Sequence, residues 1–175
     1  MSYSKGHPIR LVGGRLALDF VNTADWTADG KVAHEKLVSL ADLETWLKAA
    51  QVKIDDDHEL ADLVRFRRDL REMLRAGETR TALNEVRKLE FSGASDEAKS
   101  AQFPPLKALL AASAISVLCD PKEYGRMKMC PGDDCGWLFI DETKNSRRTW
   151  CCMETCGNRA KAARHYARRK DRNVT

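Results

Sequence analysis

Four cysteines near the C-terminus constrain the fold of this chain more than any other feature of its sequence. They form two pairs, Cys130 with Cys135 and Cys151 with Cys156, and four residues separate the members of each pair. Fifteen residues lie between the pairs. This layout lets two tight turns present four thiolates to one ion, which is a common ligand set for structural zinc. We therefore expect one structural Zn²⁺ per chain, because a catalytic zinc keeps one position open for water.

The other two cysteines leave the choice of ligand slightly open. Cys152 adjoins Cys151 and could replace it, although we expect Cys151 to bind. Cys119 lies in an apolar helical segment, where we expect a small buried side chain. Two disulfides are the alternative to zinc. We disfavour them because the N-terminal sequence lacks the uninterrupted apolar stretch of a secretory signal, which predicts a cytoplasmic protein. No apolar run approaches the roughly 20 residues that span a membrane.

Positive charge is concentrated in the same C-terminal part of the chain. The whole chain has a formal net charge of +4, whereas residues 144–172 carry ten Lys or Arg against two acids. A helix is predicted from Arg159 to about Asp171, with Asn158 as its N-cap. One face of this helix carries the cations that we expect to contact nucleic-acid phosphates: Lys161, Arg164, Arg168 and Arg172. A separate face carries a stripe of small residues that we expect to pack inward: Ala160, Ala163 and Ala167.

The preceding residues read as a mainly helical domain. Apolar side chains recur at helical spacing in four segments, at about 36–50, 57–76, 83–89 and 104–119. Gly77 offers an end to the second of these helices, and Asp120-Pro121 to the fourth. Residues 9–23 are predicted to form a small β-hairpin around Gly13-Gly14.

These patterns together predict a mainly α fold in two parts. Residues 1–121 would form a helical domain with a small β-hairpin. Residues 122–175 would form a treble-clef-like or ribbon-like zinc module ending in the basic helix. The C-terminal part has few large aliphatic side chains and needs a metal, disulfides or the support of the main domain to fold. Three aromatic side chains are expected to pack around the metal: Trp137, Phe139 and Trp150. The segment 137–141 around the first two is predicted to form a short strand.

A specific motif covers residues 130–168. It runs Cys-x4-Cys-Gly-Trp-Leu-Phe-x-Asp and then Arg-Arg-x-Trp-Cys-x-Met-x-x-Cys-Gly-Asn-Arg-x-Lys, and it resembles the CGNR zinc-finger family of bacterial proteins. Residues 16–23 and 40–47 look like the ABATE domain that accompanies this finger in stress-induced transcription regulators. The resemblance implies the same four zinc ligands: Cys130, Cys135, Cys151 and Cys156. Cys152 departs from the family pattern, which has a small polar residue such as serine at this position.

Charge distribution and resemblance favour a bacterial DNA-binding regulator of the stress response. The zinc module would position the basic helix on DNA, while the N-terminal domain would sense a small-molecule effector or form a homodimer. The alternative is a zinc-stabilised module that binds protein or structured RNA, because Arg-rich helices bind those partners too. We expect no enzyme, since no nucleophile–base constellation is visible. Three polar residues are candidates for a ligand pocket, although capping and turn bonds explain them equally well: Asp19, Asn22 and Thr23.

Overall fold

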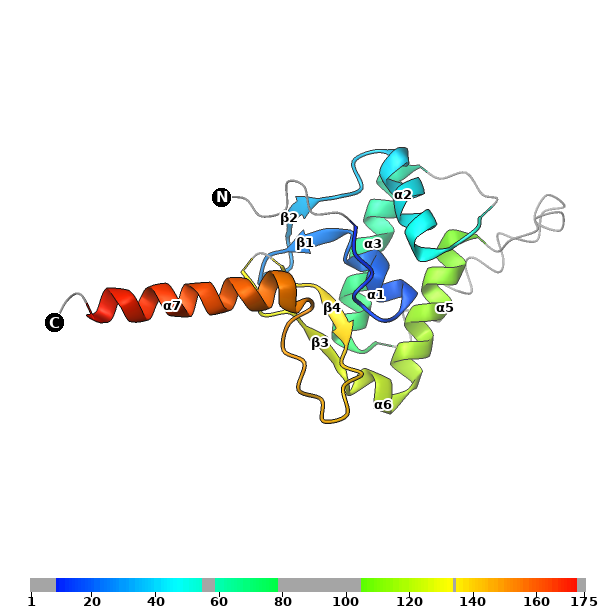
Figure 1. Cartoon of the computed structure of the whole chain (residues 1–175). Coiled ribbons are helices and arrows are strands. Elements are labelled where there is room, and N and C mark those ends of the chain that lie inside the picture. The colour runs from blue at the N-terminus through cyan, green and yellow to red at the C-terminus, as the bar shows by residue number, and fades with distance from the viewer. Residues whose placement is uncertain (1–8, 55–58, 79–104, 134, 173–175) are drawn as a thin grey trace, which may run out of the picture.

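The structure, a computed structural model, describes residues 9–54, 59–78, 105–133 and 135–172. Its helices enclose a core at one end, and a single long helix leaves the body at the other (Figure 1). The elements in chain order are α1 (Leu16–Val21), β1 (Ala24–Trp26), β2 (Val32–Glu35), α2 (Leu40–Ala50), α3 (Leu60–Ala76), α5 (Leu106–Cys119), α6 (Pro121–Tyr124), β3 (Met127–Met129), β4 (Leu138–Ile140), η1 (Met153–Gly157) and α7 (Asn158–Arg172). The chain is mainly helical, as predicted. The predicted helix at 83–89 lies outside the described residues.

The hairpin predicted at residues 9–23 is wrong, because α1 occupies the second half of that segment. Gly13 does form a turn there, with its N–H donating to the Asp19 carboxylate at 2.7 Å. Four apolar side chains of α1 are buried together: Ala17, Leu18, Phe20 and Val21. Burial on several faces favours a core helix over a hairpin with one solvated face. The hairpin of the N-terminal part instead pairs β1 with β2, with Ala24 opposite Glu35.

Sequence signals predicted where α2 and α3 end, but α2 begins at Leu40 and not at about residue 36 as predicted. Ser39 accepts a hydrogen bond from the Asp42 N–H while the Asp42 carboxylate accepts from Ser39, a capping box that starts α2. Gly77 ends α3 in the left-handed conformation, with φ of 70°. Pro105 precedes α5, and the Asp120 side chain caps the short helix α6. Cys119, which we expected to be buried, is exposed at the end of α5.

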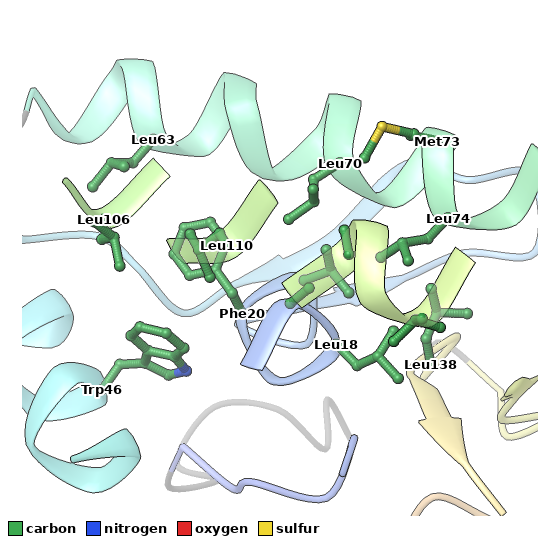
Figure 2. Packing of buried hydrophobic residues seen from close by; sticks show 14 of the residues in the cluster. Leu18, Phe20, Trp46, Leu63, Leu70, Met73, Leu74, Leu106, Leu110 and Leu138 are labelled. Atoms are coloured by element: carbon green, nitrogen blue, oxygen red, sulfur yellow. The ribbon is translucent and has the colours of Figure 1, made fainter. Parts of the chain in front are cut away.

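The main hydrophobic core lies where α1, α2, α3 and α5 meet. Figure 2 shows leucines of α3 facing Leu106 and Leu110 of α5, with Phe20 of α1 and Trp46 of α2 beside them. The rings of Phe20 and Trp46 meet edge to face, with centroids 5.2 Å apart. Leu138 of β4 also belongs to this cluster, although it comes from the C-terminal part of the sequence.

Hydrogen bonds also link the two predicted domains. The side-chain amide of Asn22 donates to the Leu138 carbonyl at 2.8 Å and accepts from the Leu138 N–H at 2.9 Å, as a neighbouring strand would. Next along the chain, the Trp26 N–H donates to the Cys135 carbonyl at 3.1 Å. The boundary near residue 121 stays a prediction, and side chains pack across it. Within the described residues, the helices are too short or too polar to cross a membrane.

Candidate metal centre and basic helix

The four cysteines of the two pairs lie together in the structure. Their sulfur atoms are all within 4.8 Å of one another, and all four residues are buried. The sulfur of Cys151 lies 3.6 Å from that of Cys135 and 3.7 Å from that of Cys156. We call these four residues the cysteine cluster. Its cysteines are free thiols rather than disulfides.

Zinc fits this arrangement. A tetrahedral site with Zn–S bonds of about 2.3 Å places neighbouring sulfur atoms about 3.8 Å apart, close to the spacing observed. Four thiolates close the coordination shell, consistent with one structural zinc.

Local structure explains how the two pairs meet. Cys130 follows β3 and Cys135 precedes β4, so the antiparallel hairpin of these strands carries the first pair at its tip. Cys156 lies in η1, which runs directly into α7. The second pair thus leads into a helix instead of a second hairpin, so the treble-clef-like arrangement fits better than the ribbon-like one.

Cys152 lies outside the cysteine cluster. Its sulfur accepts a hydrogen bond from Nη1 of Arg10 at 3.2 Å, and the residue is only half-buried. Cys151, in contrast, is 2% exposed and within reach of the other three sulfur atoms. The structure therefore places Cys151, and not its neighbour, in the cluster.

Helix α7 follows η1 directly and projects away from the rest of the molecule (Figure 1). Every residue from 161 to 170 is exposed, including Lys161, Arg164 and Arg168. The side chain of Arg172, the fourth predicted contact, lies outside the described part of the chain. Ala163 and Ala167 are also exposed, so the expected inward packing of the alanine stripe is wrong. Asn158 does not cap the helix by accepting a hydrogen bond, because the helical path already begins in η1 and its amide donates to the Glu154 carbonyl.

Two family models match the chain in the order that the motifs predicted. The CGNR zinc finger matches residues 126–169. The ABATE domain, described as a putative stress-induced transcription regulator, matches residues 14–121, which is more than half of the chain. The chain belongs to the ABATE family. Its C-terminal part is a CGNR zinc finger, and the cysteine cluster is the metal site of that finger. A search of curated proteins finds no match.

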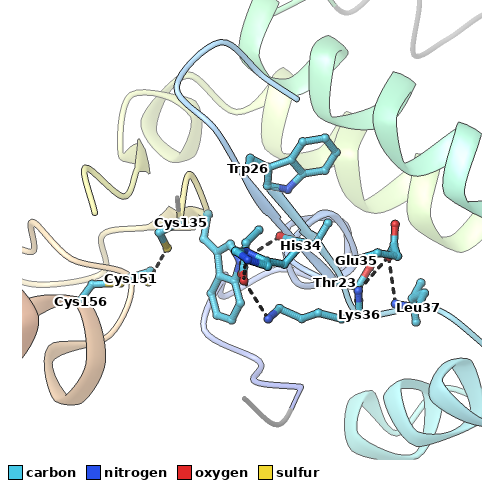
Figure 3. A network of polar contacts seen from close by, with 12 residues as sticks. Thr23, Trp26, His34, Glu35, Lys36, Leu37, Cys135, Cys151 and Cys156 are labelled. Atoms are coloured by element: carbon cyan, nitrogen blue, oxygen red, sulfur yellow. Dashed lines mark hydrogen bonds and ion pairs between the residues drawn. The ribbon is translucent and has the colours of Figure 1, made fainter. Parts of the chain in front are cut away.

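The ABATE domain contributes directly to the surroundings of the finger. Ala24 and Trp26 of β1 are buried in one cluster with the four cysteines, Trp137 and Phe139, against which Trp150 packs. The small aromatic core predicted around the metal is thus confirmed. Figure 3 shows Trp26 between the cysteines and the helices of the ABATE domain. The indole N–H of Trp137 also donates to the Ala24 carbonyl at 3.0 Å.

Two residues that sequence analysis did not single out organise the loop between the cysteine pairs. The buried carboxylate of Asp141 accepts from Nζ of Lys128 at 2.6 Å and from the Arg148 N–H at 2.8 Å. The Arg148 guanidinium donates to the carbonyls of Val12 and Cys151 and stacks on Phe139, 4.4 Å from the ring centre. Both residues belong to the CGNR motif, which was the signal available in the sequence.

Residues 143–145 and 147–153, most of which belong to this loop, line an open hollow of about 710 Å³. Lys144, Arg147 and Trp150 are among its lining residues, and Met153 at the start of η1 joins them. Lys144 and Arg147 are exposed, whereas Arg148 is occupied by backbone carbonyls. The lining contains no Asp or Glu, so the hollow is positively charged.

The three candidate ligand residues of the ABATE domain make internal hydrogen bonds instead of lining this hollow. Asp19 accepts from Gly13, Asn22 pairs with Leu138, and the Thr23 hydroxyl donates to the Phe20 carbonyl at 2.7 Å. Thr23 also accepts from Nη1 of Arg67. The local bonds of Asp19 and Thr23 match the capping and turn alternative that the sequence left open, whereas Asn22 bonds to a distant strand.

Proposed function

We propose that this protein is a DNA-binding, non-enzymatic transcription regulator whose CGNR finger anchors α7 as the DNA-contacting helix. The observation that carries the proposal is the isolation of α7: its cations are exposed, and in the described residues those at 161, 164, 168, 169 and 170 form no ion pair with a carboxylate. Solvated surface helices usually mix charges of both signs. The ABATE family description supports a regulator.

The dimensions of α7 suit the major groove. Fifteen residues at 1.5 Å each make a helix of about 22 Å, and the major groove of B-DNA admits an α-helix. Lys161, Arg164 and Arg168 follow one face at helical spacing and would contact phosphates. The exposed alanines would let the helix approach the groove closely.

Lys144 and Arg147 extend the proposed surface. They line the hollow that adjoins η1, and η1 continues into α7, so both cations lie at the base of the helix. We include them as secondary phosphate contacts. The expected roles of the ABATE domain in effector binding or dimerisation stay predictions.

Charge neutralisation on α7 tests the proposal. A triple variant with Lys161, Arg164 and Arg168 changed to Gln should lose binding to random duplex DNA, because the phosphate contacts supply most of non-specific affinity. Its zinc content should equal that of the wild type, since these side chains are remote from the cysteine cluster.

A matched triple variant controls for net charge. Lys48, Arg65 and Arg68 are exposed on the ABATE domain, so changing them to Gln removes three charges elsewhere. This control should bind DNA as the wild type does. If the two triple variants lost DNA affinity equally, α7 would be rejected as the contact surface. If the wild type bound no DNA but bound a protein or RNA partner that the α7 variant loses, the interaction-module alternative would be favoured.

A further inference from the structure

Helix α3 buries two arginines one turn apart against the ring of Trp26. Arg67 is 0% exposed and Arg71 is 1% exposed. Their guanidinium carbons lie 5.7 Å and 4.5 Å from the centre of the indole ring. Arg67 has a carboxylate partner, since its two terminal nitrogens donate to the two carboxylate oxygens of Glu35 at 2.7 Å and 2.5 Å, and only its Nε makes no hydrogen bond among the described residues. Its charge is therefore compensated within the ABATE domain.

Arg71 has no such partner. In the described part of the chain, its Nε and Nη1 atoms make no hydrogen bond, and Nη2 reaches only the thioether sulfur of Met129 at 3.6 Å. Thioether sulfur is a weak acceptor. Arg75, one turn further along α3, adds a like charge. A buried guanidinium without a counter-charge destabilises a protein strongly, so a negative charge is needed close by.

The cysteine cluster can supply that charge. Met129 directly precedes Cys130, and Gly136 directly follows Cys135. A Cβ atom built on Gly136 would lie 3.3 Å from Nη2 of Arg71, so the guanidinium lies against the backbone that carries the first cysteine pair. Gly136 has a φ of 53° and no side chain to keep the two apart. Four thiolates around one Zn²⁺ carry a net charge of −2, which a neighbouring cation stabilises.

We propose that Arg71 of the ABATE domain is the charge partner of the zinc–tetrathiolate centre and couples metal binding to helix α3. The surroundings of the metal site then include a charged residue of the ABATE domain. When zinc and its thiolates are in place, the guanidinium has a counter-charge. When zinc leaves, this compact negative centre is lost and Arg71 is buried without a counter-charge. This coupling does not depend on whether α7 binds DNA.

The zinc affinity of Arg71 variants distinguishes a charge role of this side chain from a packing role. Arg71→Met keeps an unbranched apolar chain but removes the charge, whereas Arg71→Lys keeps the charge. In competition with a zinc chelator, Arg71→Met should bind zinc about 10- to 100-fold more weakly, and Arg71→Lys should retain most of the affinity. Arg75→Met, an exposed position one turn away, is the matched control and should bind zinc normally.

The opposite ranking would overturn the proposal. If Arg71 served packing alone, the apolar Met would preserve affinity better than the charged Lys, or both would lose it equally. A normal zinc affinity for Arg71→Met would have the same meaning.

The wild-type protein provides a second test that needs no substitution. Removing zinc with a chelator should speed hydrogen exchange at the amides of residues 70–74 in α3, while α2 stays protected. Unchanged protection of α3 without zinc would overturn the coupling, whatever the folding behaviour of the variants.

Discussion

Asp141 shows how a single side chain can fix the loop that joins the two cysteine pairs. Burial alone raises the pKa of this carboxyl, but hydrogen bonds from Lys128, Thr143 and the Arg148 backbone hold its pKa below the usual range. The carboxylate therefore stays ionised and gathers donors from both ends of the loop. Arg148 can then reach the carbonyls of Val12 and Cys151 and connect the finger to the N-terminal segment.

The pKa of Asp19 is shifted in the opposite direction from that of Asp141, so this residue predicts a stability that falls as the pH rises. Burial raises its pKa to about 6, against hydrogen bonds from the Gly13 and Val12 backbone that lower it. The folded state thus binds a proton more readily than the unfolded state. The contribution of Asp19 to the free energy of unfolding is highest below about pH 4 and falls by about 2 kcal/mol as the pH rises through 6.

Asp19→Asn should remove this dependence, because the amide oxygen can still accept from Gly13 and carries no charge. Urea unfolding of both proteins at saturating zinc, from pH 4 to 7, measures it. The variant should gain about 2 kcal/mol relative to the wild type across that range. Since both proteins share the pH dependence of zinc binding, a constant difference between them would contradict the assignment.

Cys152 and Cys151 should respond differently to the same substitution. Cys152→Ser should retain zinc, because the sulfur of Cys152 lies outside the cysteine cluster and contacts Arg10. Cys151→Ser should release zinc or bind it far more weakly, because one of four thiolates is lost. Metal analysis after gel filtration decides between them, and the reverse pattern would make Cys152 the third ligand.

At the scale of elements, α7 depends on its own backbone for stability. Its residues from 161 to 170 are exposed, so only the junction with η1 is held by packing. A helix of this length is marginal in water without tertiary contacts. We expect the distal turns to form fully only on DNA.

Glycine substitutions in α7 test this coupling. Ala163→Gly and Ala167→Gly should each destabilise the helix by about 1 kcal/mol without loss of packing. Each should lower helical circular dichroism and weaken DNA affinity up to about 5-fold, with zinc content unchanged. Ala112→Gly on the exposed face of α5 is the control and should leave DNA affinity intact. If the α7 variants bound DNA with full affinity, helix formation in α7 would not be coupled to DNA binding.

Local signals in the sequence predicted the helices that have clear end signals. They failed where burial against other elements determined the structure. The prolines before α5 and Gly77 after α3 are backbone constraints that act in any context. In contrast, α1 follows two glycines that equally suit a hairpin, and only the surrounding core selects the helix. The alanine stripe of α7 failed for the same reason, because spacing identifies a face but not whether another element covers it.

At the scale of the whole molecule, the cysteine spacing predicted the metal site, whereas its surroundings could not be predicted. Trp26 and Arg71 lie far from the cysteines in sequence, and no local pattern pairs them with Gly136. Their proximity follows from the way β1 and α3 pack against the finger. Loss of zinc should therefore reach the ABATE domain as well as the finger.

Zinc stoichiometry tests the molecule-scale account of the metal site. The described residues offer one group of cysteine, histidine or acidic side chains arranged for a metal, the cysteine cluster. Elemental analysis of the purified protein should give one zinc per chain, and Cys156→Ser should reduce it to near zero. Zero or two tightly bound zinc ions in the wild type would contradict a single structural site.

The central claim is that a zinc-anchored cationic helix binds phosphate groups of DNA, and the salt dependence of affinity measures this most directly. If Lys161, Arg164, Arg168 and Arg172 each neutralise one phosphate, they contribute about −3 to −4 to the slope of log affinity for random duplex DNA against log salt, and the secondary contacts Lys144 and Arg147 add up to about −2. Each single change to Gln should reduce the slope by about one unit. An affinity that is independent of salt, or a slope that the substitutions leave unchanged, would contradict the claim.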